Sequence, residues 1–357
     1  MDVVFLDASN WNEQFWLNSG GTRAKKILQD EDGQQWFFKC SEKKEAKDNK
    51  PAKYYRYEFW SEVMAHQLGK EWGLDILRYD PAVFNGEIGC ISKSMHRTGE
   101  QQLIEVGRFM TAISSDFIPD NKETRDQYTF QLLTKTLDHF SLAGHWGFFF
   151  ETLLFDAVIG NTDRHQENWA FIGQSSLISR KLGEIEKDVQ EVPAILDNWF
   201  VRNTIGFLFD RKKKVLSKEI EQIRLQLINL ERVAPVYDSG SSLARELSDE
   251  RVRQLLENEP LLQRYVDGGL SELHWNNKKL SHFDLIGEML NSSYIEEVRK
   301  AAEFLTRFRP EKSQEIIQTI DDCVPDAWKD YRLPQSRKDL ICKLVTLRAE
   351  KLKKLIL

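Results

Sequence analysis

The sequence contains few cysteines, no long apolar run and no excess of positive charge. Its four cysteines, among 357 residues, are far apart and lack the paired spacing that binds zinc, so we interpret them as free thiols in a reducing compartment. The net charge of −6 at pH 7 gives no bulk electrostatic attraction to nucleic acid, because phosphate binding needs clustered positive charge. These features argue against a zinc protein and against direct nucleic-acid binding.

Membrane and export signals are also missing from the sequence. No apolar stretch reaches the roughly 18 residues that a spanning helix needs, and the start of the chain shows no basic flank followed by an apolar run. We therefore expect a cytoplasmic protein without a membrane partner, although secretion as an effector stays open. With 41% hydrophobic and 30% charged residues, the chain is long enough for one large two-lobed domain or two modest ones.

The most informative stretch is residues 154–172. An apolar helical run ends there at Gly160, a polar loop follows, and residues 169–172 have the pattern of a buried strand. The loop holds Asp163 and, five positions later, Asn168. An aspartate that can accept a hydroxyl proton, followed by an amide oxygen that can hold a metal, is the arrangement of a kinase catalytic loop. The alternative is a polar turn in which Asp163 caps a helix and Asn168 satisfies the backbone.

A glycine pair and a strand lysine precede this loop in the sequence. Gly20-Gly21 lies just before a predicted hairpin whose turn is Asp32-Gly33, and Lys39 lies in the second strand among aromatic residues. Glycines at that position let backbone N–H groups approach phosphate oxygens closely. A flexible turn and a solvent-exposed lysine are the alternatives. The two features together favour a cleft that holds Lys39.

Residues 57–72 show apolar positions at helical spacing, with Glu58 and Glu62 one turn apart. Either glutamate could reach a buried lysine on the neighbouring sheet. A helix that follows a lysine strand and offers it a carboxylate is the pair that positions ATP phosphates in kinases. The sequence therefore predicts an ion pair between Lys39 and one of these glutamates.

Asn85-Gly86 between two short apolar segments is a strong hairpin signal. It completes a mostly antiparallel small lobe, which we place at residues 1–95 and which the chain leaves through residues 92–95. From about residue 100 the pattern becomes helical, and residues 250–357 consist of successive predicted helices. We therefore predict a large helical catalytic lobe over residues 96–357.

Within that lobe, residues 173–232 form a long predicted insert, which we expect to pack as a helical appendage. An amphipathic stripe is formed by Leu216, Ile220, Ile223, Leu227 and Leu230. After the insert, an apolar strand delivers Asp238 to a glycine turn, where it could hold a divalent cation together with Asn168. Asp197 is the alternative ligand, but it lacks the following glycine turn.

Several of these segments, in this order, resemble the HipA-like serine/threonine kinases. They are Gly20-Gly21-Thr22-Arg23-Ala24-Lys25, Phe38-Lys39, Glu58 with Ala65, Gly160-Asn161-Thr162-Asp163-Arg164-His165 with Asn168, and Ala234-Pro235-Val236-Tyr237-Asp238-Ser239-Gly240. The resemblance covers most of the chain and is most specific in the catalytic loop and the Tyr-Asp-Ser-Gly segment. Few residues precede the glycine loop, so the chain is similar to the short, standalone kinase form.

The resemblance implies a fold and a set of roles. The fold is a two-lobed α+β kinase fold in which Asp163 is catalytic, Lys39 contacts the ATP phosphates and Glu58 pairs with Lys39, with Glu62 as the alternative partner. Asn168 and Asp238 would hold Mg²⁺, and residues 92–95 would form the interlobe linker against adenine. The residues implied to contact ATP are Ser19, Gly20, Gly21, Thr22, Arg23, Lys25, Lys39, Ser92, Lys93, Met95 and His165.

The implied activity is transfer of the ATP γ-phosphate to a hydroxyl of a protein substrate, with an antitoxin-like protein as a regulatory partner. A small-molecule kinase and a catalytically silent nucleotide-binding module are the alternatives. HipA-like kinases phosphorylate a hydroxyl of their own glycine loop, which suggests Ser19, and second Thr22, as a site of self-phosphorylation. In one respect the chain departs from the family, because Asn168 and Asp238 are 70 residues apart. We attribute this gap to the insert, since loop length costs little in closure entropy.

Overall fold

The computed structural model describes residues 2–15, 25–41, 43–44, 53–114, 117–119, 121–175, 180–185 and 207–357. The chain divides into two compact units. The first comprises Met1–Met95, Gly144–Asn168 and Pro235–Leu357, and the second comprises His96–Ala143 and Trp169–Ala234. The predicted division into lobes at residue 95 stays a prediction, because the compact units group the segments differently. Every described candidate residue lies in the first unit.

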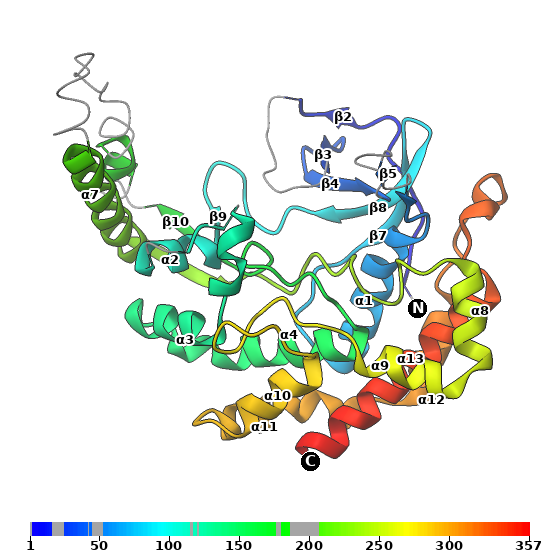
Figure 1. The fold of residues 1–357 in the computed structure, drawn as a ribbon. Helices are drawn as coiled ribbons and strands as arrows, with labels where there is room; N and C mark the ends of the chain where they lie inside the picture. Colours follow the sequence, from blue (N-terminus) through cyan, green and yellow to red (C-terminus); the bar gives the residue numbers. More distant parts are fainter. Residues whose placement is uncertain are drawn as a thin grey trace. The chain divides into compact units, whose positions relative to one another are not determined.

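The first unit contains a six-stranded sheet with the order β1-β7-β8-β4-β3-β2 (Figure 1). Its strands are β1 (Leu6–Asp7), β2 (Asn12–Glu13), β3 (Lys25–Gln29), β4 (Gln35–Cys40), β7 (Asp80–Phe84) and β8 (Glu87–Lys93). Only the β1–β7 pair of this sheet is parallel. A separate two-stranded ladder joins β5 (Lys43–Lys44) to β6 (Lys53–Tyr54).

Two tight turns fix the register of this sheet. Asn85 and Gly86 both have positive φ angles, 49° and 76°, as the two-residue turn between β7 and β8 requires. Gly33, with φ 79°, closes the turn between β3 and β4 by donating its N–H to the Asp30 carbonyl. The two predicted hairpins are thus confirmed. The β4 register places Lys39 opposite Cys90 on β8.

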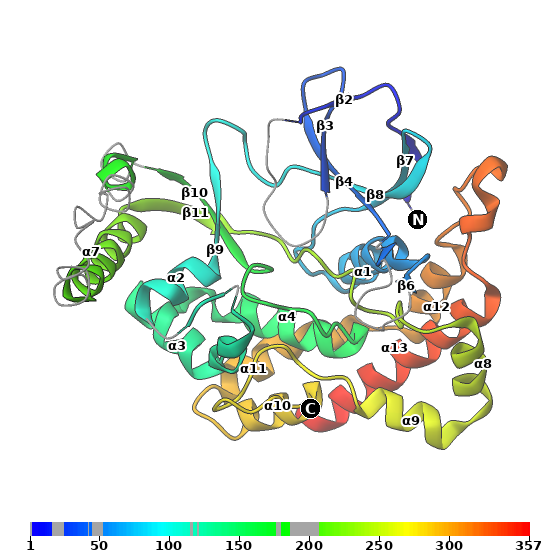
Figure 2. The ribbon, with the colours of Figure 1, turned by 45° about the horizontal axis from the view of Figure 1, so that its top comes forward.

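Helix α1 (Glu58–Trp72) packs against β7 and β8 (Figures 1 and 2). It is buried on almost every side, and both Glu58 and Glu62 are among its buried residues. Gly73 ends the helix in the left-handed conformation, with φ 83°. Because Glu58 and Glu62 lie on the buried part of this helix, they need charged partners inside the protein.

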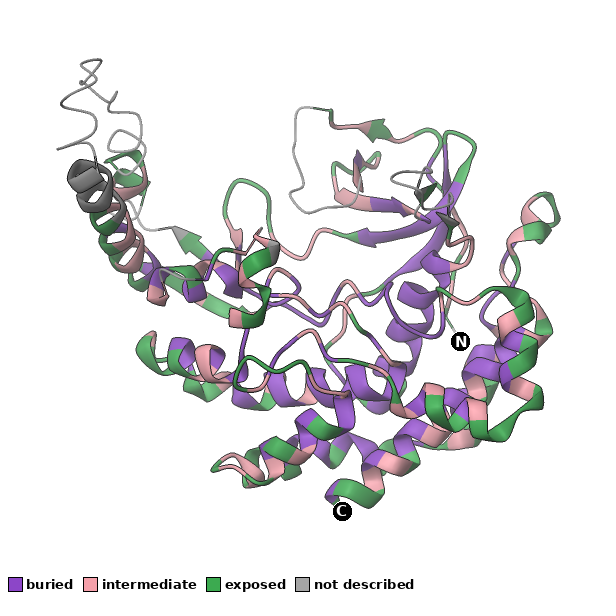
Figure 3. Cartoon of the chain, in the orientation of Figure 1, coloured by how far each residue is buried: buried purple, intermediate pink, exposed green. Residues whose placement is uncertain are grey.

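Besides α1, the first unit contains α4 (Trp146–Ile159), which Figure 3 shows buried along most of its length, and further helices. They are α8 (Asp249–Glu257), α9 (Glu259–Asp267), α10 (His282–Leu290), α11 (Ile295–Ala301), α12 (Pro310–Thr319) and α13 (Gln335–Ile356), with 3₁₀ segments Ala302–Arg307 and Asp326–Tyr331. Helices α10, α11 and α13 contact α4 directly. Because α4 ends at Gly160, with φ 68°, the chain leaves the core there and enters the predicted catalytic loop.

The second unit has a three-stranded antiparallel sheet in the order β11-β10-β9 (Figure 2). Its elements are β9 (Gln102–Glu105), α2 (Val106–Ile113), a 3₁₀ segment (Lys122–Gln127), α3 (Phe130–His139), β10 (Ala170–Ser175), α7 (Phe207–Gln226) and β11 (Ile228–Val233). Strand β10 confirms the strand predicted directly after the catalytic loop. Among the described residues, no helix is long and apolar enough to cross a membrane.

The predicted stripe of the insert is wrong in part. Helix α7 ends at Gln226, and Leu230 belongs to strand β11, because that segment pairs with β10 in an antiparallel ladder. Leu216 and Ile223 are 45% and 49% exposed. Ile220, another member of the stripe, is buried, and polar contacts also hold α7 against α2, including a hydrogen bond of 3.0 Å from the Lys218 Nζ to a backbone carbonyl of α2. Packing of the insert as an appendage of the large lobe stays a prediction.

Candidate functional site

Lys39 lies at the centre of a buried charge cluster in the first unit. From β4, its Nζ donates to Glu62 Oε1 at 2.9 Å and to Asp238 Oδ1 at 3.0 Å. Burial by itself lowers the pKa of the Lys39 ammonium, but the carboxylates of Asp238 and Glu62 outweigh that effect and hold its pKa well above the ordinary value. Lys39 therefore stays positively charged at any physiological pH.

The predicted pairing of Lys39 with Glu58 is wrong, and the alternative, Glu62, is confirmed. Glu62 uses its second oxygen to accept a hydrogen bond of 2.8 Å from the Ser239 backbone N–H. Glu58 lies one turn earlier on α1 and forms an ion pair with the Arg245 guanidinium. Each buried carboxylate thus has its own cation, and the packing of α1 on the sheet decides which one meets Lys39.

Asp238 occupies the turn that the sequence predicted. It has a φ angle of 56°, a left-handed conformation that few residues other than glycine, asparagine and aspartate adopt readily. Besides Lys39, the Lys25 Nζ lies 3.7 Å from Asp238 Oδ2. The strand expected before Asp238 ends earlier, since β11 stops at Val233 and Val236 forms an isolated bridge with Ile76. The alternative ligand Asp197 lies outside the described residues.

The loop from Asp163 to Asn168 is folded back on itself. The Asn168 side-chain Nδ2 donates to the Asp163 carbonyl at 2.8 Å, and the His165 backbone N–H donates to the same carbonyl at 3.0 Å. A carbonyl only accepts, so the amide nitrogen of Asn168 must face it and the amide oxygen is directed elsewhere. The His165 Nδ1 accepts from the Glu167 N–H at 3.3 Å. A contact of His165 with nucleotide stays a prediction.

Arg164, which the sequence reasoning left without a role, joins this loop to the Asp238 segment. Its side chain is almost fully buried and makes two hydrogen bonds to Asp156, of 2.8 and 2.9 Å. Its Nη1 donates to the backbone carbonyls of both Asn168 and Tyr237. One guanidinium therefore joins Asn168, a predicted metal ligand, to Tyr237, the residue before the other predicted ligand. The sequence signal that could have revealed this role is Asp156 in the mostly apolar run before Gly160, because a buried charge needs a partner.

Asp163 is held from the Asp238 side as well. The Ser241 hydroxyl donates to Asp163 Oδ2 at 3.1 Å, and the Thr162 N–H donates to the Ser241 carbonyl at 3.3 Å. The loop and the turn after Asp238 are thus joined by side-chain and backbone contacts. The structure brings Lys39, Asp163, Asn168 and Asp238 into one connected network, as the sequence predicted.

The predicted linker residues lie differently from the prediction. Ser92 and Lys93 belong to β8 and pair with Phe37 and Trp36 of β4, because the hairpin register continues through them. The exposed Lys93 ammonium lies 5.0 Å from the centre of the Trp36 ring. The chain leaves the sheet only at Ser94, so a linker over residues 92–95 is wrong for its first half. A nucleotide contact of Ser92, Lys93 or Met95 stays a prediction.

Part of the predicted phosphate-binding loop lies outside the described residues. It comprises Ser19, Gly20, Gly21, Thr22 and Arg23. Lys25, the sixth predicted contact, begins β3 beside Asp238. The described end of the predicted loop therefore places a second lysine beside Asp238, and its contact with nucleotide stays a prediction.

The donor set suits magnesium. Within the described part of the chain, no cluster of three or more histidine, cysteine, aspartate or glutamate side chains could hold a metal ion. Asn168 and Asp238 offer an amide and a carboxylate oxygen, which are the hard donors that Mg²⁺ takes alongside phosphate oxygens. Two protein ligands are enough for such a site, because a magnesium–nucleotide complex brings its own phosphate oxygens and waters.

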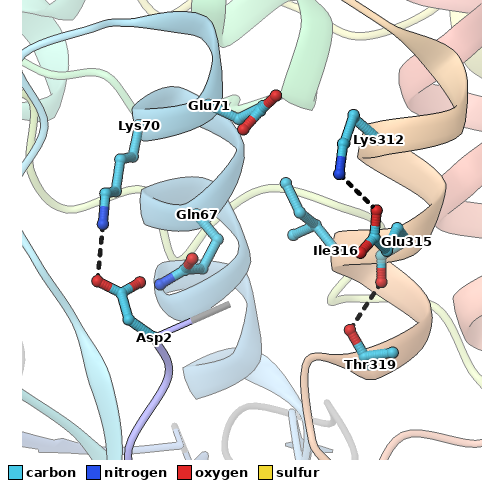
Figure 4. Close-up of a pocket in the computed structure, with 8 residues that line it drawn as sticks. All are labelled: Asp2, Gln67, Lys70, Glu71, Lys312, Glu315, Ile316 and Thr319. Carbon is cyan, nitrogen blue, oxygen red and sulfur yellow. Dashed lines mark hydrogen bonds and ion pairs between the residues drawn. The ribbon is translucent and has the colours of Figure 1, made fainter.

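A separate cavity of about 480 Å³ lies between α1 and α12 (Figure 4). Four of the charged side chains that line it pair with each other, since Lys70 binds Asp2 at 2.7 Å and Lys312 binds Glu315 at 2.9 Å. Its lining shares no residue with the Lys39 cluster. The cavity therefore does not extend the candidate site.

Among solved structures, that of a kinase resembles the chain over almost its whole length. It is the crystal structure of a Helicobacter pylori proinflammatory kinase, CtkA, with a TM-score of 0.68 and 16% sequence identity over 99% of this chain and 96% of that one. The chain has a kinase-like fold. The predicted two-lobed α+β class is thereby confirmed. No family model and no curated protein sequence matches the chain. At this identity the likeness concerns the fold, and the chemistry must be argued from the site itself.

Proposed function

We propose that this chain is an ATP- and magnesium-dependent serine/threonine protein kinase of the HipA-like type. The observation that carries the proposal is the ammonium of Lys39 held between Glu62 at 2.9 Å and Asp238 at 3.0 Å. A lysine fixed by a helix glutamate, next to an aspartate and an asparagine suited to metal, is the arrangement that orients ATP in kinases. The kinase fold supports the same conclusion.

Each residue has a distinct task in this proposal. Lys39 and Lys25 supply positive charge to the ATP phosphates, and Glu62 keeps Lys39 in place. Asn168 and Asp238 would hold Mg²⁺, which when bound neutralises charge on the phosphate oxygens. Asp163 accepts the hydrogen bond of the incoming hydroxyl and aligns it with the γ-phosphate. Catalysis then comes mainly from positioning and electrostatics.

The test is phosphoryl transfer from labelled ATP in the presence of magnesium, with and without cell extract. Asp163→Asn should abolish transfer and spare ATP binding, because the metal and phosphate contacts remain. Asp238→Ala should weaken magnesium-dependent nucleotide binding as well as turnover. Transfer at the wild-type rate by the Asp163 variant would refute the assignment, and label recovered on a small molecule only would favour the alternative substrate class.

Two further parts of the proposal concern regulation. Ser19, or secondly Thr22, is proposed as a site of self-phosphorylation that switches the kinase off. A phosphate there would add roughly −1.5 to −2 charges, and its repulsion of the ATP phosphates would expel the loop. Mass spectrometry of active protein and of the Asp163→Asn form tests this, since phosphate in both forms or in neither removes the idea. An antitoxin-like protein is proposed as partner, and co-purification from the native cell is its test.

A further inference from the structure

A line of polar contacts runs from helix α1 to the carboxylate of Asp163. Glu58 on α1 forms an ion pair with the Arg245 Nη1. The Arg245 Nη2 donates to the Ser241 hydroxyl at 3.0 Å, and that hydroxyl donates to Asp163 Oδ2 at 3.1 Å. The three links connect residues that lie far apart in the sequence, and all of them belong to the first unit.

The chemistry of the groups fixes the direction of this line. A guanidinium only donates hydrogen bonds, so the Ser241 oxygen must be the acceptor toward Arg245. The single hydroxyl hydrogen of Ser241 is then available to Asp163, whose Oδ2 accepts it. The order from Arg245 to Ser241 to Asp163 is therefore the one that uses every donor and acceptor correctly.

Arg245 is itself held firmly. Glu58 is 4% exposed, and a buried carboxylate costs free energy unless a cation stays beside it. The Arg245 guanidinium also lies 4.6 Å from the centre of the Tyr55 ring. With one side fixed by Glu58 and its face covered by Tyr55, the guanidinium has one orientation in which to meet Ser241.

We propose that Arg245 is a positioning residue, which acts through Ser241 to set the orientation of Asp163, and that Glu58 makes this orientation depend on the place of α1. The inference rests on the proposed kinase function. Helix α1 then serves both sides of the reaction, since Glu62 places the lysine that meets ATP and Glu58 places the aspartate that meets the acceptor hydroxyl.

The two glutamates should therefore have separable kinetic effects. Loss of the Arg245 line misplaces Asp163 and leaves the contacts of Lys39 with Glu62 and Asp238 in place, so kcat should fall while KM for ATP changes little. A misplacement of about 1 Å can cost on the order of 100-fold in rate, and we expect Arg245→Met and Ser241→Ala each to lower kcat about 10- to 100-fold. Since both substitutions break the same line, the double variant should lose no more kcat than the more severely impaired of the two single variants.

The matched control is Arg337→Met. Arg337 lies 5.0 Å from the Tyr57 ring and donates to the Ala244 and Leu247 carbonyls, so it resembles Arg245 in its position over a tyrosine, although it is more deeply buried. Its charged partner is Asp249, at 2.9 Å, and its loss should lower the melting temperature while leaving kcat of the folded protein unchanged.

The experiment measures kcat, KM for ATP and melting temperature for wild type, the two singles, the double and the control. Ser241→Ala removes a single oxygen atom, so it keeps the test decisive if Arg245→Met fails to fold. Additive losses in the double variant, a change confined to KM, or an equal loss of kcat in the Arg337 control would overturn the role of Arg245. Absence of any turnover by the wild type, relative to Asp163→Asn, would overturn the kinase function and this inference with it.

Discussion

Replacing Asp156 with alanine is expected to destabilise the first unit strongly, because it strands a buried charge. Arg164 is 1% exposed, and Asp156 is the carboxylate that receives both its Nε and its Nη2. Removing one partner of a buried ion pair costs about 3–5 kcal/mol, since the remaining charge stays out of water. Asn161 loses its acceptor as well, because its Nδ2 donates to Asp156 at 2.9 Å, which adds about 1 kcal/mol.

The assay is urea unfolding followed by tryptophan fluorescence, with Asp156→Ala compared with the double variant Asp156→Ala/Arg164→Met. The double variant carries no stranded charge, so it should be more stable than the single one even though it lacks more contacts. The control is Arg299→Met on α11, whose ion pair with Glu296 is solvent-exposed and should matter little.

Two results would refute this reasoning. A loss of less than about 1 kcal/mol for Asp156→Ala would mean that water reaches the guanidinium and that the pair is not buried in solution. A double variant less stable than Asp156→Ala would mean that the contacts of Arg164 with backbone carbonyls outweigh its burial. In that case Arg164 would join the two segments mainly by hydrogen bonds and not by charge.

Three other predictions follow from single residues. Gly160→Ala should lower the free energy of unfolding by about 1–2 kcal/mol because of its left-handed backbone, and by more because the new Cβ would collide with the Arg348 guanidinium. The control is Gly147→Ala on α4, where the new Cβ meets nothing within 4 Å and the change should be neutral or stabilising. Thermal melts compare the two variants. Glu62→Gln should raise KM for ATP about tenfold, equivalent to about 1.4 kcal/mol, and an unchanged KM in steady-state kinetics would contradict the role of the Lys39 pair. Burial lowers the pKa of His282 to about 4, below the roughly 6.5 of an unfolded histidine. The unfolded chain therefore takes up the proton first, and the stability of the fold falls as pH drops from about 6.5 toward 4. Replacing His282 with glutamine should flatten that decline in thermal melts between pH 7.5 and 5.

The sequence by itself determined the features that depend on near neighbours in the chain. Turn residues with positive φ, such as Gly33, Asn85 and Gly86, follow from local backbone sterics, and so both hairpins could be predicted. The predicted catalytic loop is a short segment whose Asp163 and Asn168 contact each other directly. Asp238 could likewise be identified as a candidate from its near neighbours, since a glycine turn follows it directly in the sequence.

Only the tertiary structure decided which distant groups meet. Glu58 and Glu62 lie one turn apart on one helix, and periodicity treats them alike, so the choice between them came from the packing of α1 against the sheet and from the position of Arg245. The end of α7 at Gln226 likewise depends on pairing with β10, a partner more than 50 residues earlier in the chain. Ion pairs and strand pairs between remote segments form because the fold removes those groups from water together, and no local pattern records that event.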